Sequence, residues 1–234
     1  MREMIRQILE QSQYFGLVLS IGTYLASSVL RKKTGLAILN PLLVSSALII
    51  FCLLGVGMSY EAYNKSAGYL SWLLTPATVC LAVPLYKQIH LLKAYKAAVA
   101  ASIGAGVLVS AGCVFLLSRL LGLSHTHYVT LLPKSITTAI GMGVSEEAGG
   151  IVTLTVMSIV LTGIFGSMIC EAVLKVFHVS HPAARGLAIG TSAHAVGTAK
   201  ALEMGEIEGA MSSLSIAVAG LMTVIVAPAA ANLM

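Results

Sequence analysis

Polar side chains in two stretches of this chain could together bind a small anion. In the first stretch, residues 131–150, Lys134 follows a proline and is itself followed by Ser135, Thr137 and Thr138. A helix that begins at this proline would present free N–H groups and the positive end of its dipole beside the ammonium group. Ser135 and Thr138 are three residues apart and would share one face of that helix. The pattern predicts a site for a carboxylate.

The second stretch, residues 183–202, places an imidazole among alanines and glycines. Thr191, His194 and Thr198 are spaced three and four residues apart, so they share one helical face, and Ser192 lies beside them. The small neighbouring residues allow helix backbones to approach closely. His194 could bind a substrate, relay a proton, or join two helices by a structural hydrogen bond.

Several other polar residues have two interpretations. Lys134 could instead extend to the lipid headgroups, with the neighbouring hydroxyls bonded to their own backbone. Asn40 precedes Pro41 at the start of an apolar run, and Pro76 opens another segment. Because proline frees backbone carbonyls that need partners within a membrane, Asn40 and Pro76 join the candidate site. The glutamates at segment ends are either solvated or include the carrier of a coupling proton: Glu146, Glu147, Glu203, Glu206 and Glu208.

The composition predicts a membrane protein. The chain has 234 residues, 57% hydrophobic and 10% charged, with a mean hydropathy of +0.92. A soluble domain carries about 25% charged residues. The charges cluster between long uncharged runs, and a helix of about 20 residues crosses the hydrocarbon core. The net charge of +5 comes from Lys and Arg at the ends of these runs, as in membrane proteins generally, so nucleic acid is not expected as a partner.

We therefore predict an all-α fold, a polytopic helical membrane protein with about five full spans and about three broken or re-entrant helices. The full spans are expected at residues 14–30, 36–58, 97–121, 151–177 and 210–234. The other segments are rich in Gly, Pro, Ser and Thr and are barely long or apolar enough to span: 69–86, 131–143 and 184–202. The alternative is that these are ordinary helices loosened by glycine.

A weak internal repeat is consistent with broken helices. One membrane domain is expected over residues 1–234, with N-terminal spans in 1–66 and repeat-like units near 67–125, 131–181 and 182–234. Each unit has an interrupted helix followed by a continuous one. Such repeats, often inverted, are typical of secondary transporters, whose sites lie near the bilayer midplane. Chance similarity among helices rich in Ala, Gly and Ser would also produce the pattern.

The cysteines and histidines form no pattern typical of a metal site. Each cysteine stands alone in an apolar run, without CxxC or Cys/His spacing, and no disulfide framework is indicated. The sequence has no nucleotide-binding loop and no Ser/His/Asp arrangement specific enough for hydrolysis. We expect no metal, no cofactor and no enzymatic activity.

Several short blocks occur together along the chain. They are Asn40-Pro41-Leu42-Leu43, Thr75-Pro76-Ala77-Thr78 running into Ala82-Val83-Pro84-Leu85-Tyr86, Leu132-Pro133-Lys134-Ser135, Ala184-Arg185-Gly186-Leu187-Ala188 with Gly190-Thr191, His194-Ala195 with Gly197-Thr198, and Glu208-Gly209-Ala210 with Ser212-Ser213. In this combination the chain resembles the LrgB/CidB family over most of its length from Leu36 onward. Many relatives have a proline where this chain has Ala139, so a second helix break at that position is not implied.

The resemblance implies two functions. Bacterial members are described as antiholin-like or holin-like proteins that modulate murein hydrolase activity and autolysis, beside a small LrgA/CidA-type membrane protein. Plastid relatives are glycolate/glycerate transporters, and some bacterial pairs support pyruvate uptake. The family carries no residue-level site assignment, so the site above is inferred from residue chemistry alone.

We expect an LrgB-like, multi-pass protein of the bacterial cytoplasmic (inner) membrane. The main hypothesis is a secondary transporter of small monocarboxylates of the pyruvate, glycolate or glycerate class, with proton coupling as an option. The alternative is a holin/antiholin-like regulator that acts by oligomerisation. The expected partners are the lipid bilayer, a small carboxylate substrate, an LrgA/CidA-type protein and further copies of the chain.

Overall fold

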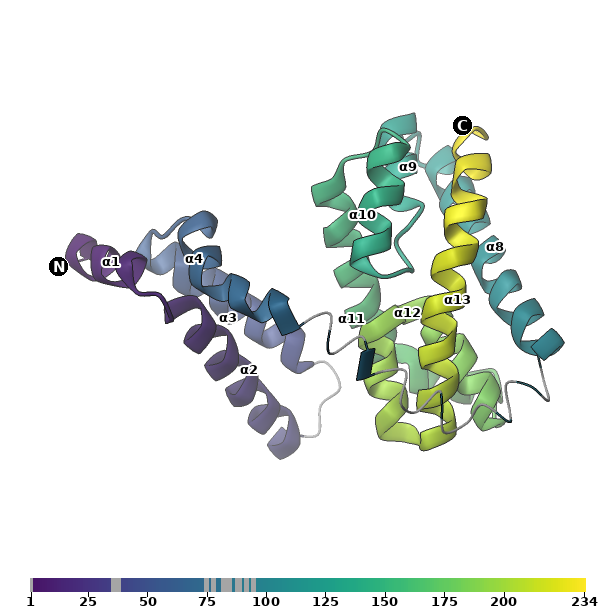
Figure 1. Ribbon diagram of the computed structural model, residues 1–234, viewed down its shortest axis with the longest axis horizontal. Coiled ribbons are helices and arrows are strands. Elements are labelled where there is room, and N and C mark those ends of the chain that lie inside the picture. Colours follow the sequence, from purple (N-terminus) through teal and green to yellow (C-terminus); the bar gives the residue numbers. More distant parts are fainter. Residues whose placement is uncertain are drawn as a thin grey trace. The chain divides into compact units, whose positions relative to one another are not determined.

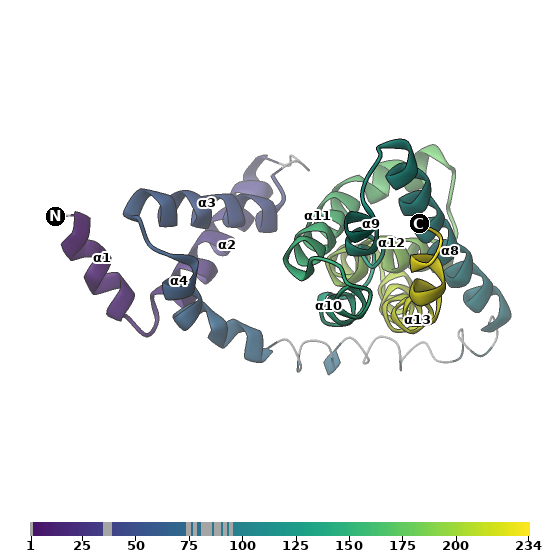
Figure 2. The same ribbon diagram turned by 90° about the horizontal axis from the view of Figure 1, so that it is seen from above.

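The described part of the chain is helical, in two compact units. The computed structural model describes residues 2–34, 39–73, 76, 79–80, 86, 90, 93 and 96–234. Within these ranges every regular element is a helix, so the all-α prediction is confirmed (Figures 1 and 2). The units are Met1–Cys80 and Leu81–Met234, and each is considered by itself. Whether they form one domain stays a prediction.

The helices of the first unit whose bounds lie within the described residues are α1 (Arg2–Gln11), α2 (Phe15–Thr34), α3 (Pro41–Val56), α4 (Tyr60–Ala67) and the 3-10 helix η1 (Gly68–Leu73). In this unit α2 packs against both α3 and α4, and its contact with α4 is especially close. The backbone N–H of Gly16 donates to Ser66 Oγ at 2.7 Å, and Ser20 Oγ lies 2.7 Å from Tyr63 Oη. A Cβ at Gly16 would meet the Tyr63 carbonyl. Glycine is therefore required where the two helices touch.

Capping at both ends makes α3 shorter than the span predicted at 36–58. Asn40 Oδ1 accepts a hydrogen bond from Leu42 N at 2.9 Å, Pro41 is the first helical residue, and Gly57 adopts φ 78° after the last turn. The 16 residues of α3 measure about 24 Å, less than a hydrocarbon core of about 30 Å. Half of the predicted interrupted segment at 69–86 lies outside the described residues.

Three long helices form the frame of the second unit: α8 (Lys96–Leu120), α11 (Val152–Val176) and α13 (Glu206–Ala231). They contain 25, 25 and 26 residues, with mean hydropathies of 2.1, 2.0 and 2.1, and so are long and apolar enough to cross a membrane. This confirms the spans predicted at 97–121, 151–177 and 210–234. Of the other two predicted spans, α2 has 20 residues but ends in Arg31, Lys32 and Lys33, and α3 is short.

A re-entrant hairpin connects α8 to α11. It consists of α9 (His125–Leu131), a non-helical turn and α10 (Thr138–Glu147), and is called hairpin 1 below. Its arms have 7 and 10 residues, about 10 and 15 Å, too short to cross a membrane. Thr155 of α11 bonds to both arms, since its Oγ1 lies 2.9 Å from Thr130 O and 2.6 Å from Ser145 Oγ. Both arms therefore meet the same end of α11.

A second hairpin connects α11 to α13. It is formed by α12 (Pro182–Met204), which is interrupted at His194 (φ 39°, ψ −136°), and is called hairpin 2. Gly190 packs against the backbone of Ser212, while Thr198 Oγ1 lies 2.7 Å from Ser212 Oγ. Residues on both sides of His194 thus contact one residue of α13, so the chain reverses at His194. The interruptions predicted in 131–143 and 184–202 are both present.

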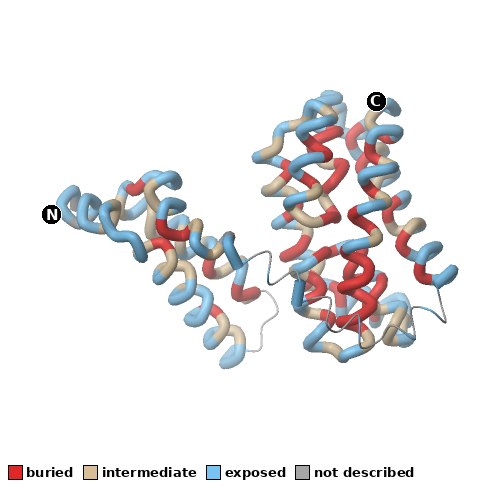
Figure 3. Tube along the Cα trace, viewed as in Figure 1, coloured by how far each residue is buried: buried red, intermediate tan, exposed pale blue. Residues whose placement is uncertain are grey.

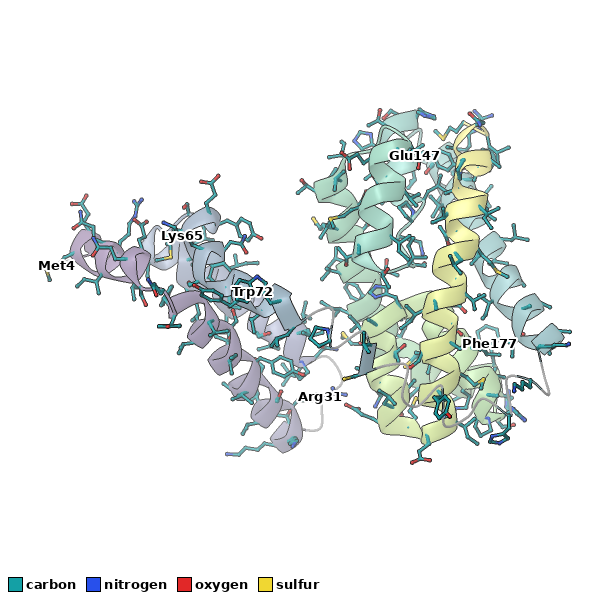
Figure 4. The ribbon with its side chains drawn as sticks, in the orientation of Figure 1. Met4, Arg31, Lys65, Trp72, Glu147 and Phe177 are labelled. Carbon is teal, nitrogen blue, oxygen red and sulfur yellow. The ribbon has the colours of Figure 1, made fainter. Side chains whose placement is uncertain are left out.

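The two hairpins enter the second unit from opposite ends. Tyr128 Oη of hairpin 1 donates to Ala230 O at the end of α13, at 2.7 Å, whereas hairpin 2 lies beside the start of α13 (Figure 1). Glu147 and Phe177 mark these two ends in Figure 4. Hairpin 1 with α11, and hairpin 2 with α13, form two hairpin–helix pairs that run in opposite directions. This is the arrangement of inverted repeats in secondary transporters.

Burial in the second unit is concentrated where hairpin 2 packs against α13 (Figure 3). The largest apolar cluster joins α8, hairpin 2 and α13 through Val99, Ile103, Val107, Leu187, Met211, Leu214 and Ala219. Gly186 and Gly190, four residues apart on one arm, both contact the backbone of α13. Small residues at this spacing let helices approach closely in a membrane, where packing rather than water exclusion holds them together.

Candidate functional site

An open cleft of about 730 Å³ lies between α8, α11 and the first arm of hairpin 2, and reaches the tip of hairpin 1. Much of its wall is apolar, including Val109, Phe165 and Ile169. The polar residues that line it are Ser102, Ser110, Lys134, Ser135, Thr162, Thr191 and Ser192. Of the predicted site residues, the structure thus brings together Lys134, Ser135, Thr191 and Ser192.

The polar part of the cleft lies halfway along the unit. Ser110 Oγ is 3.2 Å from Ser135 Oγ, and Ser110 is near the middle of α8. A small space beside the cleft is lined by Ser135, by Thr191 of hairpin 2 and by Thr223 of α13. The tip of hairpin 1 therefore meets hairpin 2 near the middle of α8, a helix long and apolar enough to cross a membrane.

Lys134 is the only cation among the residues that line the cleft. It is half-buried, and its Nζ donates to Ser135 Oγ at 3.0 Å. All nine acidic residues are glutamates within the described ranges, and none of the ion pairs found there involves Lys134. Ammonium groups inside membranes pair with carboxylates or carbonyls or mark an ion pathway. Lys134 is thus free to pair with an anion that enters the cleft.

The local backbone around Lys134 differs from the prediction. A helix was expected to begin at Pro133, but α10 begins at Thr138, and residues 132–136 form a turn in which Ile136 N donates to Pro133 O at 3.3 Å. Thr137 is the N-cap residue without a side-chain capping bond. Thr137 and Thr138 do not line the cleft. Lys134 is therefore carried by the turn itself and not by the first turn of α10.

The hydroxyls of hairpin 2 that line the cleft are bonded to their own helix. Thr191 Oγ1 donates to Leu187 O and Ser192 Oγ donates to Ala188 O, each at 2.7 Å. Each hydroxyl donates its hydrogen to the backbone, so its oxygen can accept from another donor. These groups shape the cleft and can receive a hydrogen bond from a ligand hydroxyl.

His194 lies behind the cleft and not in its wall. Its side chain is 4% exposed, and Nε2 lies 2.9 Å from Ile159 O of α11. Because a carbonyl only accepts, Nε2 carries the hydrogen and Nδ1 is the acceptor in the neutral ring. Gly163 leaves room for this ring, since a Cβ there would lie 2.6 Å from it. The observed contact agrees with the interpretation that His194 joins two helices by a structural hydrogen bond. A role of His194 in binding stays a prediction.

The left-handed backbone of His194 is unusual for a residue with a Cβ. Such conformations persist where surrounding contacts determine them. Here the contacts are the imidazole bond to Ile159 and the Thr198 hydroxyl, which donates to His194 O at 2.9 Å. Thr198 is also buried, does not line the cleft, and bonds to Ser212. His194 and Thr198 together build the reversal in hairpin 2.

Two predicted site residues belong to the first unit. Asn40 is buried and caps α3, and the side chain of Pro76 is exposed within that unit. Their part in the site stays a prediction. Conversely, the sequence analysis did not select Ser110 and Thr162, which line the cleft from α8 and α11. The only available signal was an isolated hydroxyl within an otherwise apolar run.

Known proteins agree with the resemblance seen in the sequence. The model of the LrgB-like family matches residues 20–233. The chain is 38% identical over 217 residues to the antiholin-like protein LrgB of Bacillus cereus (strain B4264) and to that of Bacillus anthracis (strain A0248). Each alignment covers 92% of this chain and 94% of the relative. No solved structure matches the chain. The chain belongs to the LrgB-like family.

Proposed function

We propose that this chain is a secondary transporter of small monocarboxylates, of the pyruvate, glycolate or glycerate class, in the bacterial cytoplasmic membrane. The observation that carries the proposal is the Lys134 ammonium group, which lines the cleft at mid-depth without an acidic partner among the described residues. An ammonium group at the centre of a bilayer costs about 2.5–3.5 kcal/mol or more. A bound carboxylate offsets that cost, so substrate and site stabilise each other.

The lining of the cleft suits an anion with a short carbon skeleton. The carboxylate would contact Lys134 Nζ and the Ser135 hydroxyl, which lie 3.0 Å apart. A hydroxyl group on the next carbon would reach Ser110 or Thr191, a keto group would accept from Ser110, and the carbon chain would contact Val109. Sites of this type have mostly apolar walls and few polar groups that fix orientation. A dicarboxylate would leave its second charge without a cationic partner.

The antiparallel hairpin–helix pairs provide a means of alternating access. The cleft runs along the half of the unit that contains hairpin 2, since Ala184, Leu187 and Ala188 form one wall, and it stops at the tip of hairpin 1. In inverted repeats the two halves can exchange conformations, so that the site opens to the opposite side. We infer that displacement of hairpin 1 would open the site toward that side. Glu208 is the candidate for proton coupling, because it is buried while the other glutamates are not.

Uptake into proteoliposomes tests this function. Radiolabelled pyruvate, glycolate and glycerate are offered to the reconstituted wild type, to Lys134→Ala and to Lys65→Ala, the control at an exposed lysine of α4 (Figure 4). Saturable uptake of at least one substrate is expected, with kcat/KM lowered at least about tenfold in Lys134→Ala, equivalent to about 1.4 kcal/mol. The control is expected to match the wild type. Equal uptake by all three proteins would remove Lys134 from the site.

The names of the relatives favour a second candidate function more directly than transport. They are called antiholin-like, which corresponds to a regulator of murein hydrolase activity and autolysis that acts by oligomerisation, alone or with an LrgA/CidA-type protein. Holin-type pores need only oligomerising helices, whereas re-entrant hairpins with polar tips are typical of carriers. A dye or ion leak from proteoliposomes, without saturation by any carboxylate and increasing with protein density, would reverse the order of the two functions.

A further inference from the structure

A second cavity, of about 670 Å³, lies where α11 meets hairpin 2. Its polar and charged lining residues are Glu171, Lys175, His178, Ser180 and Arg185. Leu174 lines both this cavity and the cleft, and it is buried, so it forms the wall between them. The cavity is therefore separate from the candidate carboxylate site.

Arg185 has hydrogen-bonding capacity that the protein does not use. Its Nη1 lies 3.6 Å from Glu208 Oε1, while its Nε is buried without a hydrogen-bond partner in the described structure. A guanidinium group offers five N–H donors in a planar fork that matches carboxylate and phosphate oxygens. The single long contact with Glu208 leaves most of these donors available.

The other lining residues add to the attraction for an anion. The side chains of Lys175 and His178 take part in none of the hydrogen bonds or ion pairs resolved in the described residues, whereas their backbones are bonded to each other. The negative charge of Glu171 is balanced by Lys200, whose Nζ is 2.6 Å from Glu171 Oε1. Ser180 adds a hydroxyl. The cavity thus joins the Lys175 and Arg185 side chains, the His178 ring and the Ser180 hydroxyl around one compensated carboxylate.

The position of the cavity is at the membrane boundary. Lys175 is in the last turn of α11, a helix long and apolar enough to cross the bilayer. The next residues, Val176 and Phe177, are 70% and 74% exposed, and Phe177 is labelled at this end in Figure 4. Apolar side chains beside a basic pocket fit the junction of acyl chains and headgroups.

We infer that this cavity binds a phosphate group, either from the headgroup of an anionic phospholipid or from a dissolved phosphate. Arg185 would bind two phosphate oxygens through its fork, with Lys175 and the Ser180 hydroxyl on the remaining oxygens. Phosphate bound here would compete with Glu208 for Arg185 and so affect the contact between hairpin 2 and α13. This inference is independent of the proposed transport function, because the experiment below measures phosphate binding and not transport.

Thermal unfolding of the full-length protein in a neutral detergent tests the site in two arms. In the first, the protein is titrated with phosphatidylglycerol or with phosphatidylcholine. In the second, it is titrated with inorganic phosphate against sodium chloride at equal ionic strength. Saturating occupancy at about ten times Kd is expected to raise Tm by about 3–5 °C. A shift with phosphatidylglycerol alone identifies a lipid headgroup, and a shift with inorganic phosphate identifies a dissolved ligand; either supports the site.

The double variant Lys175→Gln/His178→Asn tests whether the Tm shift comes from binding in this cavity. Asparagine tolerates the positive φ of 55° at position 178, and neither substitution removes a resolved hydrogen bond, so folding is expected to be retained. The Tm shift should disappear in this variant and persist in Arg119→Gln, a control in the last turn of α8 at the opposite end of the unit. A shift that is absent from the wild type in both arms, or equal in the double variant, would overturn the inference.

Discussion

The two hairpins of the second unit have similar shapes and both use neutral hydrogen bonds, but within the described residues only hairpin 2 adds ion pairs to neighbouring helices. Hairpin 1 is joined to α11 by neutral hydrogen bonds, in which Thr155 bonds to both arms. Hairpin 2 is joined at its open end by ion pairs, from Arg185 to Glu208 of α13 and from Lys200 to Glu171 of α11. These are the only ion pairs that connect different helices within the described ranges.

At the tips of the hairpins the difference is reversed, because the charged side chain belongs to hairpin 1. The tip of hairpin 1 carries Lys134, whose ammonium group has only the Ser135 hydroxyl as a resolved partner. The tip of hairpin 2 carries His194, which is buried and bonded to the Ile159 carbonyl. One hairpin thus has its unpaired charge at mid-depth, and the other has its charges at the membrane boundary, where water reduces their cost. The difference agrees with the proposal that a ligand binds at the tip of hairpin 1, and it indicates that charge anchors the open end of hairpin 2.

The largest expected effect comes from filling the contact between hairpin 2 and α13. A Cβ at Gly190 would collide with the backbone of Ser212, which cannot move away alone. We expect Gly190→Ala to destabilise the protein by about 3 kcal/mol. In hairpin 1, Gly141→Ala meets the end of the flexible Ile159 side chain and should cost about 1 kcal/mol. Unfolding in detergent measures both. Equal losses would show that the hairpins are packed alike.

The Gly112→Ala variant is the control for this pair. No atom lies within 4 Å of a Cβ at Gly112, which is in α8. Removing a helical glycine at an open position is neutral or stabilising, by up to about 1 kcal/mol. A loss of stability in the control would indicate a general effect of substitution and not a packing contact.

Removal of the buried carboxylate at the base of hairpin 2 should have the next largest effect. Glu208 is 8% exposed and Arg185 31% exposed. Glu208→Gln leaves a partly buried guanidinium without its counter-ion, at a cost of about 2 kcal/mol, less than for a fully buried pair. Glu206→Gln, at an exposed position of the same helix, is the control and should change Tm little. If both variants unfold at the wild-type Tm, the ion pair does not anchor hairpin 2.

Loss of the hydrogen bonds of hairpin 1 should lower the free energy of unfolding by a smaller amount. Thr155→Val keeps the shape of the side chain but removes the hydroxyl that contacts Thr130 O and Ser145 Oγ. The expected loss is about 1–2 kcal/mol, because buried polar groups lose a partner. Thr153→Val, at an exposed position two residues earlier, is the matched control. Hydrogen exchange of α9 and α10 should increase in the first variant only.

The smallest effect is expected at the exposed ion pair of hairpin 2. Lys200 Nζ lies 2.6 Å from Glu171 Oε1, but the two side chains are 20% and 56% exposed. Lys200→Gln should therefore cost only about 0.2–1 kcal/mol, with the difference from wild type decreasing at high salt. Measurements of Tm at low and high sodium chloride check this. A salt-independent loss would mean that packing of the lysine stem, and not charge, holds this arm.

Much of the architecture could be predicted from the sequence because the bilayer restricts it strongly. Hydropathy located α8, α11 and α13, and the polar, glycine-rich composition located both interrupted segments. The exact interruptions could not be predicted. Pro133 was compatible with a helix start, but its carbonyl closes a turn and the helix begins at Thr138. At His194 the reversal depends on Ile159, which is distant in the sequence.

The candidate site could also be predicted only in part, because contacts between residues that are distant in the sequence determine it. Lys134, Ser135, Thr191 and Ser192 line the cleft as expected, since their segments carry most of the polar groups. Helical periodicity placed Thr191, His194 and Thr198 on one face, which fails because the chain reverses at His194. Ser110 was not selected because a single serine in an apolar helix has no distinctive pattern.

The hairpins also determine what a topology map of this protein would report. Each hairpin returns to the side from which it entered, so it adds no crossing. The carbonyl of Met234 lies 3.1 Å from His125 Nδ1, which places the chain end beside the start of hairpin 1. Accessibility labels or reporter fusions at residues 121–124, at 148–151 and after Met234 should therefore share one face of the membrane. Labels at 177–181 should lie on the other, and counting every hydrophobic segment as a crossing would invert the assignment.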